Sequence, residues 1–505
     1  MLGESIDEAP AREAGKGYAN LPPEPDPAPS PSPGVPRHTP DSPRARATPV
    51  TVAVLAALVV AIGALESMPL PALPLIQREL GLTPAQAALL ATTLLLTGSV
   101  TMPTIAKLAD ARGGQRTLLA LAWCIVAGGT CSAFAGSLPA MLFGQFMQGL
   151  GAAIVPATFV VLRESFPERM PVAVGVITGC FTIGGGVGVL ASGPLADALS
   201  RRWMFLLPTL IVAALAVVAH RALPRRTVHK GRSARLDWPG GALLAATLVT
   251  VILNLTWLPQ NGWSSFTTLA LLVLTIVFGA AWVWVERRAA DPMVDLRMLG
   301  RRGVWSSSVV AGMLGAGYTV PYFLFPQLLA MPPAVAGFGF GASSSAVSLY
   351  LFPGIAVAIV VGPLTGLLVR RVGSRAVVAG GLVLTASGAL IATLWHSAPW
   401  HVLLSLLLTT GLGMGTASTA LYTGIIDSVE QADTGVATAL SGISRGIGAS
   451  LGVQIAAVII SAGTSPVTHL PTEQGFQAGF LLSAALVLLP LAIVRFVPGS
   501  TRAVR

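Results

Sequence analysis

Charged residues and histidines are scarce in this chain of 505 residues. Asp, Glu, Lys and Arg together make up 10% of it, while apolar residues make up 53%. Its six histidines avoid the centres of the long apolar runs, so we expect no buried histidine relay. There are only three cysteines, and Cys124, Cys131 and Cys180 lack the spacing of metal ligands. Nucleotide-binding, nucleophile-elbow and zinc motifs are missing too, so we expect no enzyme, ATP-driven pump, metal or cofactor.

Long apolar runs fill almost everything after residue 48. Short polar links cut this stretch into about fourteen pieces, each long enough to cross a bilayer as a helix. Only helices satisfy every backbone group inside hydrocarbon without closing into a barrel, so we predict an all-α integral membrane protein. The predicted spans lie near residues 50–75, 84–107, 117–137, 139–162, 171–196, 203–222, 238–258, 265–286, 304–330, 345–369, 376–395, 399–424, 435–462 and 477–498.

The basic residues predict the orientation of these spans. If both termini are cytoplasmic, 27 of the 31 Lys and Arg residues lie on the cytoplasmic side. Only Arg78, Arg201 and Arg202 then lie outside, and Arg445 lies within a span. The positive-inside rule strongly favours this topology, with the basic face next to anionic lipid. The same charges are scattered over seven segments without a binding module, so no nucleic-acid partner is expected.

The first 48 residues differ from the rest of the chain. They contain eleven prolines, mixed charges and no apolar periodicity, which predicts a disordered cytoplasmic tail. The tail is not a signal peptide, because the first apolar run is of full span length. An inert tail is the favoured interpretation, and a partner-binding role is the alternative.

Two internal repeats indicate that the chain was built by duplication. The polar link 106–116 resembles 366–375, which lies 260 residues later, with small residues, Leu, charge, Gly and Arg at matching offsets. The spacing of Gly184, Gly188 and Ser192 also resembles that of Gly448 and Gly452. We therefore predict two pseudo-symmetric six-helix bundles (49–222 and 301–505, the latter with a short tail). Residues 223–300 would be two inserted helices with basic cytoplasmic links. Secondary transporters use such repeats to build a site between two rocking halves.

The motifs of these repeats resemble those of the major facilitator superfamily, in its fourteen-spanner drug:proton antiporter branch, over residues 49–498. Its loop signature is Gly-x-Leu-x-Asp-Arg-x-Gly-Arg-Arg. Here Asp110 and Gly113 are retained, while Ala106 and Ala111 replace the first Gly and the first Arg. The resemblance implies that the acid caps a neighbouring helix and pairs with Arg, which stabilises the outward-facing state. The candidate residues of the two loops are Lys107, Asp110, Arg112, Gly113, Arg116, Gly366, Arg370, Gly373 and Arg375.

The fifth span resembles the antiporter signature Gly-x-x-x-Gly-Pro-x-x-Gly-Gly, which is associated with exporters. Val189 stands in place of the Pro and Ser192 in place of one Gly. Small residues also let helices approach closely, so ordinary packing is the alternative. The candidate packing residues are Gly149, Gly184, Gly188, Ser192 and Gly193.

Spans 1 and 4 also depart from the family pattern, at polar positions within the membrane. The segment Leu65–Pro74 resembles the family segment Leu-Asp-x-Thr-x-x-Asn-x-x-Leu-Pro, with Glu66 as its acid. In span 4, Gln145 stands where the family carries an Arg that is thought to help proton coupling, and Gln148 follows. Both Glu66 and Gln145 are expected to face one cavity. A carboxyl without an arginine partner is more stable inside the membrane in its neutral form. A neutral, hydrogen-bonded structural Glu is the alternative.

The resemblance implies export of amphipathic, hydrophobic or cationic small molecules, including drugs and antibiotics, in exchange for protons. Glu66 and Arg445 are the candidate proton-coupling residues. The substrate cavity would include Glu66, Gln145, Gln148, Tyr318, Tyr322 and Gln327. The proton gradient would be the only energy source, and a monomer in the bacterial cytoplasmic membrane is favoured. The alternatives are a uniporter or importer of a specific metabolite on this fold, and a non-transporting sensor or scaffold.

Overall fold

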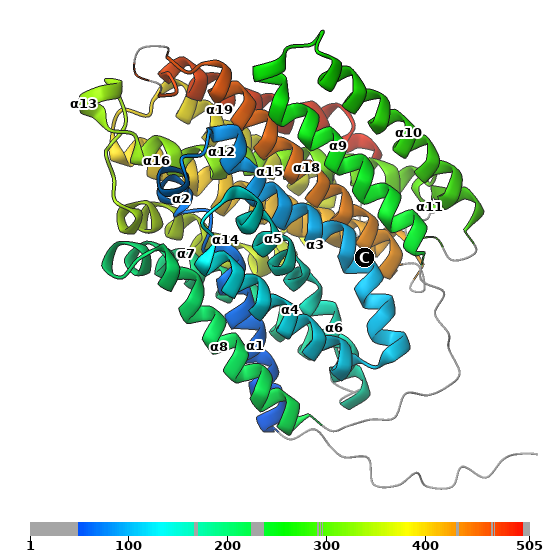
Figure 1. Ribbon diagram of the computed structural model, residues 1–505. Helices are drawn as coiled ribbons and strands as arrows, with labels where there is room; N and C mark the ends of the chain where they lie inside the picture. The colour runs from blue at the N-terminus through cyan, green and yellow to red at the C-terminus, as the bar shows by residue number, and fades with distance from the viewer. Residues whose placement is uncertain are drawn as a thin grey trace, which may run out of the picture. The chain divides into compact units, whose positions relative to one another are not determined.

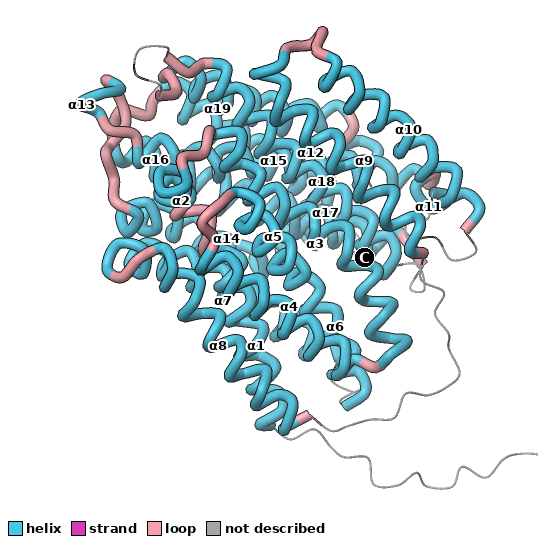
Figure 2. The backbone as a smooth tube through the Cα atoms, in the orientation of Figure 1, coloured by secondary structure: helices cyan, strands magenta, loops and turns pink. Residues whose placement is uncertain are grey.

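The computed structural model describes residues 49–165, 170–223, 237–289, 292, 294, 296–430, 434–465, 468 and 470–497. The predicted tail 1–48 and the C-terminal residues 498–505 lie outside these ranges, as does most of the link between spans 6 and 7. The described residues form helices joined by short loops and contain no β-strand (Figures 1 and 2).

Fourteen spans in the described residues are long and apolar enough to cross a membrane, which confirms the predicted number. The first six consist of α1 (Pro49–Ser67), α2 (Leu73–Leu80), α3 (Pro84–Arg112), α4 (Gly114–Phe134), α5 (Leu138–Gly149), η1 (Leu150–Ala153), α6 (Ile154–Ser165), α7 (Met170–Ala198) and α8 (Arg201–Ala222). The inserted spans are α9 (Trp238–Asn261) and α10 (Phe266–Arg288), followed by the short α11 (Leu296–Leu299). The last six consist of α12 (Arg302–Ala330), α13 (Pro333–Ala336), α14 (Ser344–Val372), α15 (Ser374–Leu394), α16 (Pro399–Leu406), η3 (Leu407–Met414), α17 (Gly415–Ser428), α18 (Thr434–Ala462), α19 (Glu473–Leu488), η4 (Leu489–Ala492) and η5 (Val494–Phe496).

Local sequence signals determine where several of these helices begin. Thr83 and Gln86 form a capping box at the start of α3, with Pro84 as the first helical residue. Ser343 caps α14 through the backbone N–H of Ala346, at 3.3 Å. These caps satisfy N–H groups that have no partner within the helix, and they fix the point at which each span begins.

Three spans do not remain regular α-helix over their predicted length. The first span was predicted as continuous over 50–75, but α1 ends at Ser67 and α2 begins at Leu73, because Pro69 and Pro71 cannot continue the helix. The fourth span of each half is also interrupted, by the 3₁₀ turn η1 in the first half and by the π-helix η3 in the second. Irregular helix at membrane depth is typical of functional sites in transporters.

The two halves repeat the same close helix contact. A Cβ atom on Gly184 or Gly188 of α7 would overlap the backbone of Val60 or Ala64 of α1. A Cβ atom on either of the second-half glycines would overlap the backbone of α12. These second-half pairs are Gly448 with Gly312 and Gly452 with Ala316. Spans 1 and 5 of one bundle therefore meet in the same way as spans 9 and 13 of the other, as expected for two pseudo-symmetric six-helix bundles.

Helices α3 and α7 of the first bundle pack against α18 and α14 of the second. The inserted α9 contacts α10, α3 and α18, and the pair lies together at one edge of the structure (Figure 1). Buried Gln454 of α18 donates a hydrogen bond to Thr256 of α9 (2.8 Å) and another to the carbonyl of Ala85 (3.3 Å). Only 6% of the most apolar stretch of α10 is buried against other helices, so α10 presents most of its surface to lipid.

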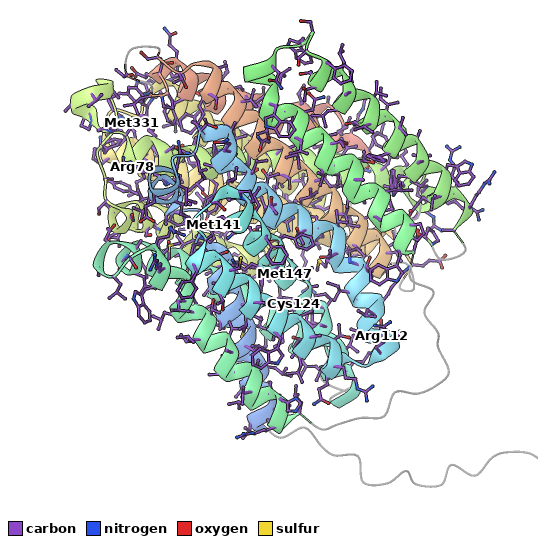
Figure 3. The ribbon with its side chains drawn as sticks, in the orientation of Figure 1. Arg78, Arg112, Cys124, Met141, Met147 and Met331 are labelled. Atoms are coloured by element: carbon purple, nitrogen blue, oxygen red, sulfur yellow. The ribbon has the colours of Figure 1, made fainter. Side chains whose placement is uncertain are left out.

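The two ends of the helix assembly are named here by their short helices. The α2 end carries α2 and α13, and the α11 end carries α11 and the start of α1. Figure 3 shows Arg78 and Met331 at the α2 end and Arg112 at the opposite end, with Cys124, Met141 and Met147 between them. Because long helices run between these ends, groups near helix centres lie deep in the membrane.

Candidate functional site

Glu66 lies at the break in the first span, as the second-last residue of α1. The break frees backbone carbonyls, and the Ser192 hydroxyl of α7 donates to one of them, that of Met68, at 2.7 Å. Ser67 donates back to the carbonyl of Gly63 at 2.9 Å. The Ser192 bond anchors the break to α7, and the Ser67 bond lies within the last turn of α1.

The side chain of Glu66 packs against the interrupted fourth span. A Cβ atom on Gly151 of η1 would overlap Glu66 Oε1 and would lie 3.0 Å from Ile62 Cγ2. Glycine at this position therefore leaves the space that the carboxyl group occupies, and a larger residue would require the Glu66 side chain to move. Glu66 Oε1 is buried and has no hydrogen-bond partner among the described residues. A buried carboxyl oxygen without a partner has a lower free energy when the group is protonated, so this site is suited to binding a proton.

Gln145 and Gln148 both point to α4. Gln148 Nε2 donates to Ser132 Oγ at 2.8 Å, and Gln145 Nε2 donates to the same oxygen at 3.4 Å. Both glutamines are almost completely buried, and the Oε1 atom of each lacks a partner within the described part of the chain. Ser132, which sequence reasoning missed, thus holds the residue that replaces the family Arg.

Arg445 of α18 lies inside the second bundle. Its guanidinium group is close enough to the hydroxyls of Tyr318 on α12 and Tyr422 on α17 to interact with both. Tyr322 lies one helical turn beyond Tyr318, on the same face of α12. Gln327, the third predicted polar residue of this span, is buried, and its Nε2 has no partner among described groups. The structure therefore brings Arg445 and Tyr318 together and adds Tyr422, which the sequence did not single out.

The predicted loop of the first half forms an ion pair within its own bundle. Asp110 near the end of α3 accepts a hydrogen bond from Arg163 of α6 at 2.5 Å. Lys107 Nζ donates to the carbonyl of Pro292, in the link after the inserted spans, at 3.2 Å. Arg112 and Arg116 are exposed. Arg163 was missed, although it is the basic residue in the last turn of α6.

The turns after spans 2 and 10 have the same geometry. Gly113 and Gly373 have φ angles of 96° and 89°, which side-chain-bearing residues rarely adopt. Two residues later, Gln115 donates to the carbonyl of Leu223 (3.1 Å) and Arg375 donates to that of Val497 (2.6 Å). In each bundle the bond joins the start of the third span to the residue just after the sixth. Gly366 and Arg370 lie earlier on α14, with open space around Gly366.

The remaining packing residues lie at helix contacts. A Cβ on Gly149 would come within 2.6 Å of the carbonyl oxygen of Leu94 on α3, and one on Gly193 would overlap the backbone of Ser344 on α14. The Gly193 N–H also donates to Ser348 Oγ at 2.9 Å. The fifth span therefore contacts α1 of its own bundle and, both at its middle and at its end, α14 of the second bundle.

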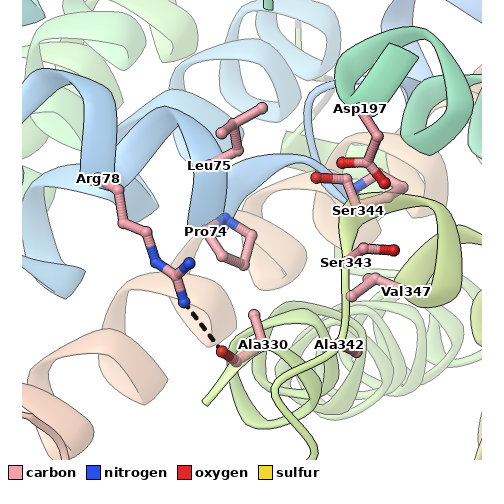
Figure 4. A pocket seen from close by; sticks show the side chains of 10 residues that line it. Pro74, Leu75, Arg78, Asp197, Ala330, Ala342, Ser343, Ser344 and Val347 are labelled. Atoms are coloured by element: carbon pink, nitrogen blue, oxygen red, sulfur yellow. Dashed lines mark hydrogen bonds between the residues drawn. The ribbon is translucent and has the colours of Figure 1, made fainter. Parts of the chain in front are cut away.

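Two charged residues of the first bundle bind helix ends of the second bundle at the α2 end. Asp197 Oδ2 accepts a hydrogen bond from the Ser345 N–H in the first turn of α14, at 2.7 Å. Arg78 donates to the carbonyl of Ala330, the last residue of α12, at 2.9 Å (Figure 4). A carboxylate favours a helix N-terminus and a guanidinium favours a C-terminus. We refer to these two contacts as the α2-end clamp.

A small cavity of about 150 Å³ lies between the two contacts of the clamp. Leu75 of α2, Ala342 of the link before α14 and Val347 of α14 line it together with Arg78 and Asp197 (Figure 4). The cavity thus marks the seam between the bundles at this end.

These observations define a polytopic α-helical membrane protein made of two repeated bundles. One bundle holds a partly buried acid beside a broken helix, and the other holds a partly buried cation. The sequence matches the Major Facilitator Superfamily over residues 55–453, and the chain belongs to this superfamily of membrane transporters.

Several relatives are named as antibiotic resistance or export proteins. The puromycin resistance protein pur8 of Streptomyces alboniger is 29% identical and covers 83% of this chain and 85% of its own length. The lincomycin resistance protein of Streptomyces lincolnensis is 26% identical, over 92% of this chain and 94% of its own. The cephamycin export protein CmcT of Amycolatopsis lactamdurans is 27% identical, over 84% and 87%.

Solved transporters share the fold at low sequence identity. A mutant form of the nucleoside transporter NupG aligns with a TM-score of 0.64 at 12% identity, over 88% of this chain and 99% of its own. A bacterial homologue of the lysosomal transporter Spinster, in an inward-facing conformation, aligns with a TM-score of 0.63 at 15% identity, over 88% and 95%. These likenesses support the transporter fold.

Proposed function

We propose that this protein exports small amphipathic molecules across the cytoplasmic membrane in exchange for protons, and that Glu66 carries the proton. The observation that carries the proposal is the Glu66 carboxyl group, which lies at a helix break with one buried oxygen unpartnered in the described residues. Gly151 makes the space that this group occupies. Such a group binds a proton when enclosed and releases it when water reaches it.

The direction of transport and the substrate class rest on the relatives. Proteins that cover most of this chain are named for resistance to puromycin or lincomycin, or for export of cephamycin. Resistance by a transporter is achieved by removing the drug from the cell. Export of drug-like molecules is therefore the activity that we assign to this chain.

The orientation follows from the basic residues of the described helix ends. The α11 end carries most of them, in agreement with the positive-inside rule, so we assign this end and both termini to the cytoplasm. The residues used are Lys107, Arg112, Arg116, Arg163, Arg221, Arg287, Arg288, Arg297, Arg301, Arg302, Arg370, Arg371, Arg375 and Arg495. The α2-end clamp then closes the structure toward the outside.

Inverted membrane vesicles from an efflux-deficient host test the proposal. We expect a pH gradient to drive accumulation of fluorescent drugs such as ethidium by the wild type, and Glu66→Gln to abolish it, because Gln keeps the shape but binds no proton. Glu473→Gln, an exposed acid at the start of α19, is the matched control and should retain transport. Unchanged pH-driven transport by Glu66→Gln would remove Glu66 from the mechanism.

A uniporter on the same fold is the second candidate. It is favoured by Gln145, whose amide is held by Ser132 and provides no positive charge for Glu66. The same vesicles separate the two functions. Collapse of the pH gradient with a protonophore should stop accumulation by an antiporter, whereas a uniporter would equilibrate its substrate at the same rate.

A further inference from the structure

Arg445 occupies the interior of the second bundle, where α18 crosses α12. A Cβ atom on Gly315 of α12 would lie 3.1 Å from Arg445 Cγ, so the two helices are in close contact there. The guanidinium group interacts with the hydroxyls of Tyr318 and Tyr422, and a Cβ atom on Gly442, one turn before Arg445, would lie 3.7 Å from the Tyr422 hydroxyl. Three different spans thus converge on a single cation.

Among the described residues, no carboxylate is one of the groups that interact with this guanidinium. Two of the described acids form ion pairs with other arginines: Asp110 binds Arg163 and Glu79 binds Arg201. Glu66 packs against Gly151 of the first bundle. Arg445 Nε is buried and has no hydrogen-bond partner among the described groups. The charge of Arg445 is therefore not compensated by an acid of this bundle.

Tyrosine hydroxyls satisfy only part of what a guanidinium requires. The group has five N–H donors in a planar fork, and phenols are neutral. A buried cation without an anionic partner is unfavourable. A carboxylate is the group whose geometry fits the fork, because it accepts two parallel hydrogen bonds and neutralises the charge.

We propose that Arg445, with Tyr318 and Tyr422, binds a carboxylate or similar planar anionic group of the transported molecule. This proposal rests on the proposed transport function and adds a preference for acidic or zwitterionic molecules among its substrates. A zwitterion satisfies both proposals, since its ammonium group replaces the proton on Glu66 while its carboxylate binds Arg445. The second bundle would thus recognise the acidic end of the substrate.

Two matched fluorescent probes test this assignment. The ε-dansyl derivatives of lysine and of lysinamide share a dansyl ring and an ammonium group, and only the first carries a carboxylate. Binding is measured by dansyl fluorescence with the full-length protein in lipid nanodiscs. We expect the wild type to bind the carboxylate probe at least about tenfold more tightly, as a charge-assisted bidentate contact implies.

Arg445→Gln should bind the two probes equally, and Arg445→Lys should keep part of the preference because it keeps the charge. Tyr422→Phe should reduce the preference without removing it. Arg202→Gln, which changes an exposed cation at the α2 end, should bind like the wild type. Size-exclusion profiles of the variants check that each is folded, and the Lys variant provides a conservative test if Gln is unstable.

The proposal is overturned if the wild type binds both probes equally, fails to bind the carboxylate probe, or keeps its preference in Arg445→Gln. Its failure is distinguishable from failure of the transport proposal. Equal probe binding together with Glu66-dependent, pH-driven ethidium transport would refute only the carboxylate site. A carboxylate preference in a protein without pH-driven transport would support the site and refute the antiport.

Discussion

Removal of the α2-end clamp should open that end of the transporter. Asp197 and Arg78 belong to the first bundle, and their partners, Ser345 and Ala330, belong to the second. Any movement that separates the bundles at this end must break both hydrogen bonds. Asp197→Ala and Arg78→Ala therefore destabilise the closed state and leave contacts within each bundle unchanged.

The size of the effect follows from the geometry and exposure of the two contacts. A hydrogen bond between a helix-terminal backbone group and a charged side chain is worth about 1.5–3 kcal/mol when buried. Both side chains are exposed, so we reduce this to about 1 kcal/mol for each contact. One such loss shifts the ratio of open to closed molecules about fivefold. The two contacts involve separate helix ends, so the double variant should shift it about 25-fold.

Cysteine labelling measures this shift. A single cysteine in place of Ala342, which lines the cavity at the clamp, is introduced after Cys124, Cys131 and Cys180 are replaced by alanine. Its rate of reaction with a maleimide in detergent should rise about fivefold in Asp197→Ala. Glu79→Gln is the matched control, because Glu79 lies at the same end but accepts its 2.6 Å hydrogen bond from Arg201 of its own bundle.

The clamp would be refuted by a labelling rate in Asp197→Ala equal to that of the parent protein. An equal increase in Glu79→Gln would refute it as well, because general loosening of this end, rather than separation of the bundles, would then explain the change. Asp197→Asn refines the result. It keeps an acceptor but loses the charge, and it should lie between the parent and the alanine variant.

Two further predictions concern packing and coupling. Gly188→Val should lower the melting temperature and the yield of folded protein, because the valine side chain would overlap the backbone of Ala64. Gly175→Ala, at a position with open space around it, should be tolerated. Fluorescence-detected size exclusion after heating measures both variants. Gln145→Arg should shift the pH optimum of transport downward with little effect on folding, because it supplies the cation that favours ionised Glu66. Coincident pH profiles of transport for Gln145→Arg and the wild type would rule out a coupling role for residue 145.

Much of the fold could be predicted from the sequence because hydrophobic length and charge placement are strong, local signals in a membrane protein. The repeated glycine spacing also predicted the pseudo-symmetry of the two bundles, since Gly184 and Gly188 make the same type of contact as Gly448 and Gly452. The break after Ser67 was not predicted. Apart from Glu66 the run 50–75 has no charged residue, and hydropathy does not distinguish a continuous helix from one that ends before Pro69.

The partners of the loop residues were harder to predict than the residues themselves. Asp110 stood out by its motif, and nearby Arg112 and Arg116 were the obvious candidates for its partner. The structure instead pairs it with Arg163, 53 residues away, because the ends of α3 and α6 meet in the folded bundle. Neighbours in sequence on a helix end point in different directions, so proximity along the chain is a weak guide to ion pairs.

Scarcity of charge explains why sequence reasoning located the candidate site but not its surroundings. In spans almost free of ionisable groups, Glu66 and Arg445 are conspicuous, and their cost in the membrane argues that they are functional. Their neighbours are not conspicuous: Gly151 is one of 55 glycines, and Tyr422 lies on a different span from Arg445. What makes these neighbours important is the space that one leaves for a carboxyl group and the hydroxyl that the other brings to a guanidinium group. Both depend on how four helices cross, and the sequence of any single helix does not contain that information.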